Sequence, residues 1–70
     1  MIFGLFKPAT RVTMRKVYAK QVTEYSYVAG GRTVRLRYDD TTAGRLAWMK
    51  HCKDNGIKPN MEYGEDIHEC

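Results

Sequence analysis

The sequence is poor in the residues that staple or ligate a small domain. It holds two cysteines and two histidines in 70 residues. Two cysteines are too few for a disulfide framework, and whether Cys52 and Cys70 are bridged or free stays open, with free thiols expected in a reducing compartment. No C-x-x-C or H-x-x-x-H spacing is present, and adjacent helical residues such as His51 and Cys52 would point roughly 100° apart. The sequence predicts no metal site.

Long apolar runs and catalytic motifs are missing as well. The apolar segment at residues 1–6 ends at Lys7-Pro8, far short of a signal-peptide core or a membrane-spanning helix. We therefore expect a cytoplasmic protein without a membrane partner. The chain has no G-x-S-x-G, no P-loop and no pair of carboxylates on one rigid element, and so small a domain hardly encloses a cleft. These absences predict a protein that is not an enzyme and that binds no cofactor.

The residues that are present predict one small folded domain. Hydrophobic residues make up 43% of the chain and charged residues 29%, which is ordinary for a globular domain. A chain this short buries only about 60% of its unfolded surface, so its core is marginal. We predict a single α+β domain over residues 1–58, including the apolar segment 1–6. An acidic C-terminal tail follows over residues 59–70.

Two adjacent glycines predict a β-hairpin. Gly30 and Gly31 supply the positive φ angles that a tight two-residue turn requires. The resulting register gives one aromatic and aliphatic face and one opposite-charge pair on the other face, and a slip by one residue would lose both. The predicted pairs are Tyr25 with Leu36, Tyr27 with Val34, and Glu24 with Arg37.

Upstream of the hairpin, residues 11–22 are ambiguous between strand and helix. Val12 and Met14 alternate with polar residues, as in a strand, whereas Met14 and Tyr18 recur at a helical spacing. The density of Val, Thr and Tyr favours a strand, joined to the hairpin through a bulge near residues 15–16. We therefore predict a small antiparallel sheet of two to four strands.

One helix is predicted over residues 42–55. The Asp-Thr-Thr run at 40–42 offers side-chain oxygens to the amides of the first turn, and Gly56 supplies a left-handed cap before Pro59. The apolar side of this helix should cover the aromatic face of the hairpin, because neither element buries its apolar surface alone. That side is predicted to hold Leu46, Trp48, Met49 and Cys52, with Lys50, His51 and Asp54 opposite.

Charge is distributed unevenly along the chain. Residues 1–53 carry eleven Lys or Arg against three acids, and residues 54–70 carry five acids against one Lys. A basic body attracts anionic partners. A short acidic tail competes for the same surface or keeps the protein soluble. Within it, Met61 and Tyr63 either add one edge strand or anchor the tail.

A chain of this size usually works by occupying a surface on something larger. Tyr, Trp and Met are enriched in interface hot spots, and this chain has five Tyr, four Met and one Trp. We therefore expect a small non-catalytic binding protein that regulates or inhibits a larger nucleic-acid-handling protein or complex. The alternative is direct nucleic-acid binding through the basic face of the hairpin.

In size and charge layout the chain resembles small accessory proteins of viruses and mobile elements. That resemblance implies a binding role against host nucleic-acid machinery, and no individual motif carries it. The sequence leaves the oligomeric state open. The residues predicted to contact the partner are Arg11, Arg15, Lys20, Arg32, Arg35, Arg37, Phe3 and Phe6.

Overall fold

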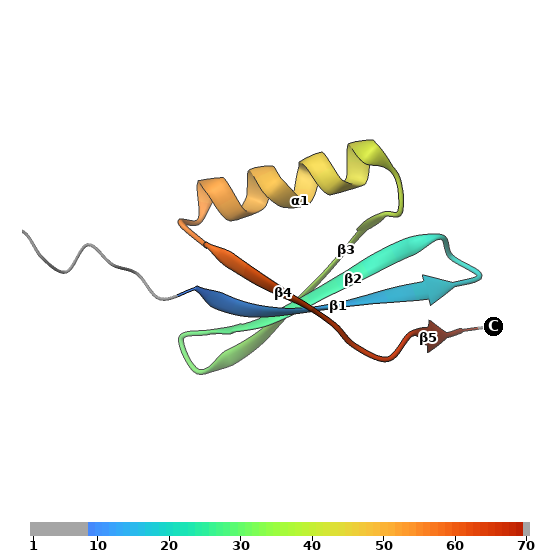
Figure 1. Ribbon diagram of the computed structural model, residues 1–70, viewed down its shortest axis with the longest axis horizontal. Coiled ribbons are helices and arrows are strands. Elements are labelled where there is room, and N and C mark those ends of the chain that lie inside the picture. Colours follow the sequence, from blue (N-terminus) through green and yellow to red (C-terminus); the bar gives the residue numbers. More distant parts are fainter. Residues whose placement is uncertain (1–8, 70) are drawn as a thin grey trace, which may run out of the picture.

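The computed structural model describes residues 9–69, which form one sheet with a single helix on one side of it (Figure 1). The predicted α+β class is confirmed. The sheet is mostly antiparallel, but its five strands exceed the predicted two to four. The predicted contact residues Phe3 and Phe6 lie outside the described residues. The elements are β1 (Thr10–Tyr18), β2 (Val22–Ala29), β3 (Arg32–Asp39), α1 (Thr42–Asp54), β4 (Pro59–Tyr63) and β5 (Ile67–His68).

The hairpin between β2 and β3 has the predicted register. Gly30 and Gly31 carry φ angles of +59° and +77°, which only glycine adopts without strain. Tyr25 and Tyr27 lie on one face and are both buried. Each of the three predicted cross-strand pairs is present. Period-two alternation and the glycine pair were therefore sufficient to fix this part of the fold.

The ambiguous segment forms strand β1, which pairs antiparallel with β2. Its residues 13–17 pair without interruption with residues 22–26, so the bulge predicted near residues 15–16 is absent. Val12 and Val17 are the two most deeply buried side chains. Since they are an odd number of residues apart in one strand, they lie on opposite faces of the sheet. The alternation of apolar and polar residues thus changes phase within β1 because Val12 is buried on one face of the sheet and Val17 on the other.

Helix α1 has the predicted ends. The hydroxyl of Thr41 accepts a hydrogen bond from the Gly44 N–H at 3.1 Å, as an N-cap does. At the other end Gly56 has a φ of +65°. The N–H of Ile57 reaches back to the carbonyl of Cys52 at 2.8 Å. This is the bond of a Schellman cap, which satisfies a carbonyl that the helix leaves free.

The prediction for the buried face of α1 is confirmed at Trp48 and Cys52 and wrong at Leu46 and Met49. Gly44, Trp48 and Cys52 form the buried row, while Leu46 and Met49 are 58% and 61% exposed. Gly44 sets this orientation, because a Cβ there would lie 1.8 Å from the carbonyl oxygen of Asp39. The helix therefore approaches the end of β3 through its one glycine. Trp48 and Cys52, which follow Gly44 at intervals of four residues, face the sheet as well.

An aromatic cluster fills the space between α1 and the sheet. The rings of Tyr25 and Trp48 stack with centroids 4.3 Å apart and planes 7° from parallel. His51, predicted on the solvent side, is half-buried and lies 2.8 Å from the Tyr27 hydroxyl. The core comprises Val12, Tyr25, Tyr27, Trp48 and Cys52, with Met14, Val34, Leu36, Tyr38 and Ile57 packed around them.

The acidic segment set apart as a tail supplies β4 and β5. Both strands run parallel to β1, after α1 has crossed from the β3 edge of the sheet to the β1 edge (Figure 1). Met61 and Tyr63 belong to an edge strand, which was one of the two predicted alternatives. Every residue of β4 is exposed, so backbone pairing and charge, rather than apolar burial, hold this strand. Within the described residues, no helix combines the length and apolar character needed to cross a membrane.

Candidate functional site

The predicted basic residues gather mainly on the face of the sheet that α1 leaves uncovered, called the open face below. Alternation along β1 and β3 directs the odd-numbered residues of both strands to this face. Lys20 lies in the turn between β1 and β2, and Arg32 follows the hairpin turn. The structure thus collects four of the predicted arginines on one face: Arg11, Arg15, Arg35 and Arg37.

Arg37 is committed to contacts within the protein. Its Nε lies 3.1 Å from the carboxylate of Glu24, the residue opposite it on β2. Its terminal nitrogen lies 2.9 Å from Glu69, beyond β5. The hydrogen bonds that Arg37 donates, to Glu69 first and then to Glu24, raise the pKa of Arg37 above its ordinary value. Arg37 is therefore the central residue of an ion-pair network rather than a free contact.

The C-terminal segment pairs with two more of the predicted residues. Arg11 lies 3.1 Å from Glu62 on β4, and the ammonium of Lys20 lies 3.5 Å from Glu69. The hydrogen bond from Arg37, followed by the charges of Arg37 and Lys20, holds the pKa of the Glu69 carboxyl below its ordinary 4.5. The acidic segment therefore neutralises part of the basic surface, which is one of the two roles that the sequence suggested for it.

Arg15 is half-buried beneath the connection between β4 and β5. A Cβ at Gly64 would lie 2.8 Å from the Arg15 Nε, so a larger residue there would force the Arg15 side chain to shift. That Nε is buried and has no hydrogen-bond partner among the described residues. Covered in this way, Arg15 contributes its positive charge to the open face but offers little contact area.

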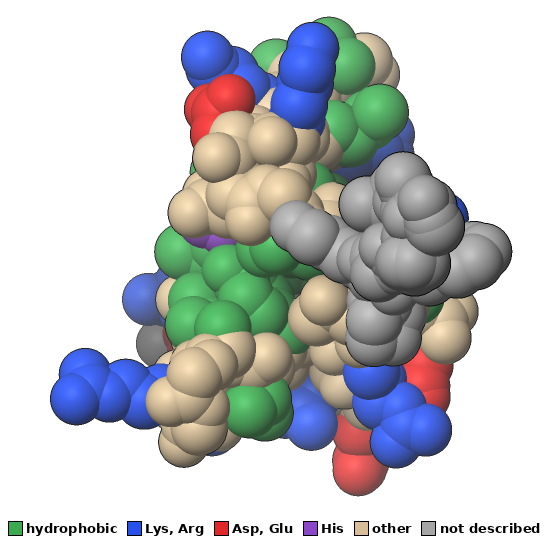
Figure 2. All heavy atoms as spheres, turned by 90° about the vertical axis from the view of Figure 1, so that its left-hand side faces the viewer, with side chains coloured by type: hydrophobic (Ala, Val, Ile, Leu, Met, Phe, Trp, Pro, Cys, Tyr) green, Lys and Arg blue, Asp and Glu red, His purple; other side chains and the backbone are tan. Residues whose placement is uncertain are grey.

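Arg32 and Arg35 are the predicted residues that remain available. Both are exposed on β3, and neither has an acidic partner among the described residues. β3 is also the outermost strand on its side of the sheet. Figure 2 views the side where α1 ends and the hairpin turn projects, and it shows Lys and Arg side chains around a hydrophobic area. We name the free edge of β3, with Arg32 and Arg35, the β3 edge.

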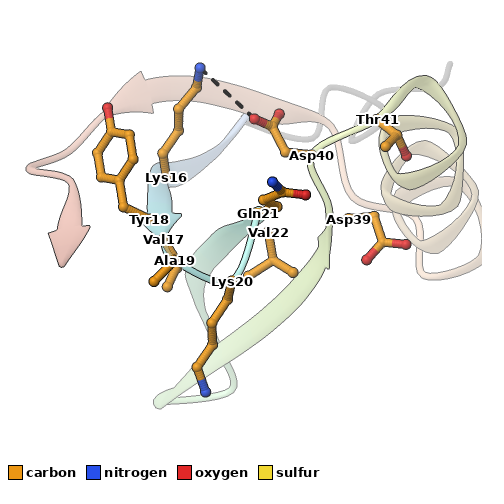
Figure 3. A pocket seen from close by; sticks show the side chains of 10 residues that line it. All are labelled: Lys16, Val17, Tyr18, Ala19, Lys20, Gln21, Val22, Asp39, Asp40 and Thr41. Atoms are coloured by element: carbon orange, nitrogen blue, oxygen red, sulfur yellow. Dashed lines mark ion pairs between the residues drawn. The ribbon is translucent and has the colours of Figure 1, made fainter. Parts of the chain in front are cut away.

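A hollow of about 660 Å³ lies beside the turn between β1 and β2. Figure 3 shows its two lysines pointing in different directions, with Lys16 directed to Asp40 and Lys20 directed away. The Lys16 ammonium lies 3.9 Å from the Asp40 carboxylate. Since its charged groups do not converge, this hollow has neither the nucleophile and base of an active site nor a cluster of like charge for a ligand.

Metal chemistry has no support in residues 9–69. No group of three or more His, Cys, Asp or Glu side chains there is placed to hold an ion. Cys52 is buried in the core, and burial raises the pKa of its thiol. A raised pKa lowers the thiolate fraction and makes the thiol a poor ligand and nucleophile.

Sequence reasoning found Glu24 as the partner of Arg37 but missed the acidic partners that the C-terminal segment supplies. Glu62 and Glu69 lie far along the chain from Arg11 and Arg37, and only the parallel pairing of the C-terminal strands with β1 brings them together. The alternation of Met61 and Tyr63 with polar neighbours was the available signal for β4. No protein-family model, no curated protein and no solved structure matches the chain.

Proposed function

We propose that the protein is a non-catalytic binding module that attaches to the surface of another protein through the β3 edge. In this role it regulates or inhibits a larger nucleic-acid-handling protein or complex in the cytoplasm. The observation that carries the proposal is the combination, on one exposed strand, of a free sheet edge with two arginines that lack an acidic partner among the described residues. Arg is enriched at interface hot spots, and free strand edges pair readily with other chains.

The net charge supports the proposed class of complex. The chain carries a net charge of +4, so it concentrates near polyanions, where complexes that handle nucleic acid also work. The ion pairs formed by the C-terminal segment remove part of this attraction at β1 and in the turn after it. The remaining positive charge on the sheet is therefore weighted toward β3.

The placement of the aromatic residues favours a protein partner over nucleic acid. Tyr25 and Tyr27 are buried against Trp48 and present no face for a base to stack on. Tyr18, which is exposed, is already stacked on His68 with centroids 4.8 Å apart. Single-strand binding without sequence preference depends on such stacking platforms. Tyr63 on β4 is 69% exposed, but it lies at the opposite edge of the sheet from Arg32 and Arg35, so little aromatic surface is available beside the β3 edge.

Direct nucleic-acid binding is the second candidate, because Arg32 and Arg35 are exposed cations on the outermost strand of the sheet. Arginines placed in this way can contact phosphates. Phosphate contacts would make the affinity fall steeply as salt increases.

Affinity capture from source cells, with and without nuclease treatment, separates the two candidates. We expect protein partners to remain bound after nuclease treatment and to be lost when Arg32 and Arg35 are both changed to Glu. The matched control changes Lys50 and Lys53, on the exposed side of α1, to Glu, since it alters the charge equally. Sub-micromolar binding to a random oligonucleotide at about 150 mM salt, lost in the β3 variant alone, would reverse the order of the candidates.

A further inference from the structure

The free backbone groups of β3 can be assigned from its register. In a hairpin with a two-residue turn, the residues flanking the turn exchange both hydrogen bonds, and the pattern then alternates. Ala29 and Arg32 flank this turn. The outward-facing N–H and C=O groups of β3 therefore belong to its odd-numbered residues. No described segment pairs with those of Thr33, Arg35 and Arg37, whereas Gly44 of α1 packs against the backbone of Asp39 at the end of the strand.

The side chains of these same residues lie on the open face. A strand added at this edge would place every second side chain beside them. Arg35 is exposed and stands opposite the short Ser26 on β2, so its guanidinium is available to an acid on the added strand. Arg37 is already bound to Glu24 and Glu69. Charge complementarity at this edge therefore depends on Arg35, with Arg32 near the turn.

A second copy of the chain fits this edge poorly. In an antiparallel ladder, two residues directly opposite one another either both point their backbone groups at the partner strand or both point them away. The outward-facing odd-numbered residues of β3 must therefore lie opposite odd-numbered residues of β3 in the second copy. The two such registers with the longest overlap place Arg35 opposite Arg35 or opposite Arg37 of the second copy. Like charges directly opposite one another are destabilising. The strand that fits is acidic and belongs to another chain.

The opposite side of the sheet shows the same mode of binding within the molecule. There β4 and β5 add along β1, and their acidic residues pair with basic residues of the sheet. Glu62 lies against Arg11, and Glu69 lies against Arg37 and Lys20. An extended acidic segment is thus already bound to this sheet through backbone pairing and arginine contacts. The β3 edge has the same two components and no occupant among the described residues.

We propose that the β3 edge binds an extended acidic segment of a partner protein as an additional strand, with an aspartate or glutamate of that segment paired with Arg35. This inference rests on the proposed function and specifies its partner: a segment in which acidic and β-branched residues alternate. The acids lie on the open face, and the β-branched side chains extend the face that packs against α1. Backbone pairing supplies affinity in such complexes, and the alternate side chains supply specificity.

The test uses the full chain and a peptide as long as β3 that alternates glutamate with valine. Amide hydrogen exchange is measured residue by residue with and without the peptide. We expect slower exchange at the outward-facing amides of Thr33, Arg35 and Arg37. The amides of Val34 and Leu36, already bonded to β2, should change little.

Two variants and one control peptide sharpen the test. Arg35→Glu should weaken peptide binding about tenfold, whereas the matched charge reversal Lys53→Glu on α1 should change it by less than about twofold. Thr33→Pro removes one outward-facing N–H and keeps the bonds to β2, because an edge strand tolerates proline at such a position; it should also weaken binding. A peptide of equal charge should not bind when it is N-methylated on the alternate residues whose N–H groups would face β3, because it then cannot donate the backbone hydrogen bonds.

Several results would overturn the proposal. They are equal losses in Arg35→Glu and Lys53→Glu, unchanged binding of the N-methylated peptide, protection at β4 instead of β3, and dimerisation of the free protein through β3. Failure of the peptide to bind, with protein partners still captured through Arg32 and Arg35 after nuclease treatment, would refute strand addition and leave the proposed function standing. If the protein partners are lost while the peptide still binds, the proposed function alone is refuted.

Discussion

Replacing Gly44 by alanine sets two opposing effects against each other. Alanine in a helix interior is favoured over glycine by about 1 kcal/mol. A Cβ at position 44, however, would lie 1.8 Å from the Asp39 carbonyl oxygen and 2.9 Å from the Asp39 nitrogen. The neighbouring atoms belong to the backbone, so no side-chain rotation relieves the contact. Helix α1 must move away from the end of β3.

That movement acts directly on the core. Trp48 lies about one helical turn after Gly44 on the same face of α1, and its ring stacks on that of Tyr25 with a centroid separation of 4.3 Å. Overpacking of a well-packed site costs about 1–3 kcal/mol and more where the backbone must shift. Taking the upper end and subtracting the helix preference, we expect Gly44→Ala to lower the free energy of unfolding by about 2 kcal/mol. For a domain of this size that is a large fraction of the total.

Chemical denaturation followed by Trp48 fluorescence measures the effect. The control is Ala47→Gly, at an exposed position of the same helix, which reports the propensity difference alone and should cost about 1 kcal/mol. The two substitutions are inverse in chemistry and should nevertheless both destabilise. A rise in the denaturation midpoint of Gly44→Ala would show that α1 does not approach β3 through this glycine.

Further substitutions test the buried face of α1, the turn between β1 and β2, and the ion-pair network around Arg37. In denaturation followed by circular dichroism, which does not depend on the single tryptophan, Trp48→Ala should cost about 3–5 kcal/mol and Leu46→Ala less than about 0.5 kcal/mol, because only the former side chain is buried. Ala19 has a φ of +74°, so Ala19→Gly should raise stability by about 0.5–1 kcal/mol. The Glu69 carboxyl has a pKa lowered from 4.5, chiefly by Arg37. Its stabilising effect is therefore fully present above that value and is lost as the pH falls below it. The denaturation midpoint of the wild type should accordingly drop more between about pH 5 and pH 3 than that of Glu69→Gln, and equal drops would contradict the pairing.

The parts of the fold that were predicted correctly depend on neighbours along the chain. The glycine pair at 30–31 and the alternation around it specify one register, and the caps at Thr41 and Gly56 specify where α1 begins and ends. The buried face of α1 was predicted from the most apolar side of the helix. The structure instead turns Gly44 toward β3, because close approach of the backbone requires the smallest residue there.

The acidic C-terminal segment shows why the rest of the site was not predicted. Four of its twelve residues are acidic and none is Lys or Arg, and every residue of β4 is exposed, so its local composition is typical of a tail. Its pairing with β1 is parallel and joins residues about fifty positions apart, for which no local pattern exists. The predicted pair with Glu24 already distinguished Arg37 from Arg35. What the sequence did not show is the second acidic partner of Arg37, Glu69, which the C-terminal segment brings to it.

The two sides of the sheet therefore differ in charge as well as in pairing. Beside β1, Glu62 and Glu69 lie against basic residues and reduce the local field. At β3, Arg32 and Arg35 face solvent without acidic partners among the described residues. Exposed cations without acidic partners thus lie beside unpaired backbone groups, so attraction guides an acidic strand to the edge that can bind it. Steering of this kind raises association rates and is weakened by salt.

Arg35→Glu should lower both the association rate of the acidic peptide and the dependence of that rate on salt. The peptide's association rate with Arg11→Glu, next to Glu62, should change much less. Equal changes in both variants would mean that net charge, and not its position at β3, governs the encounter.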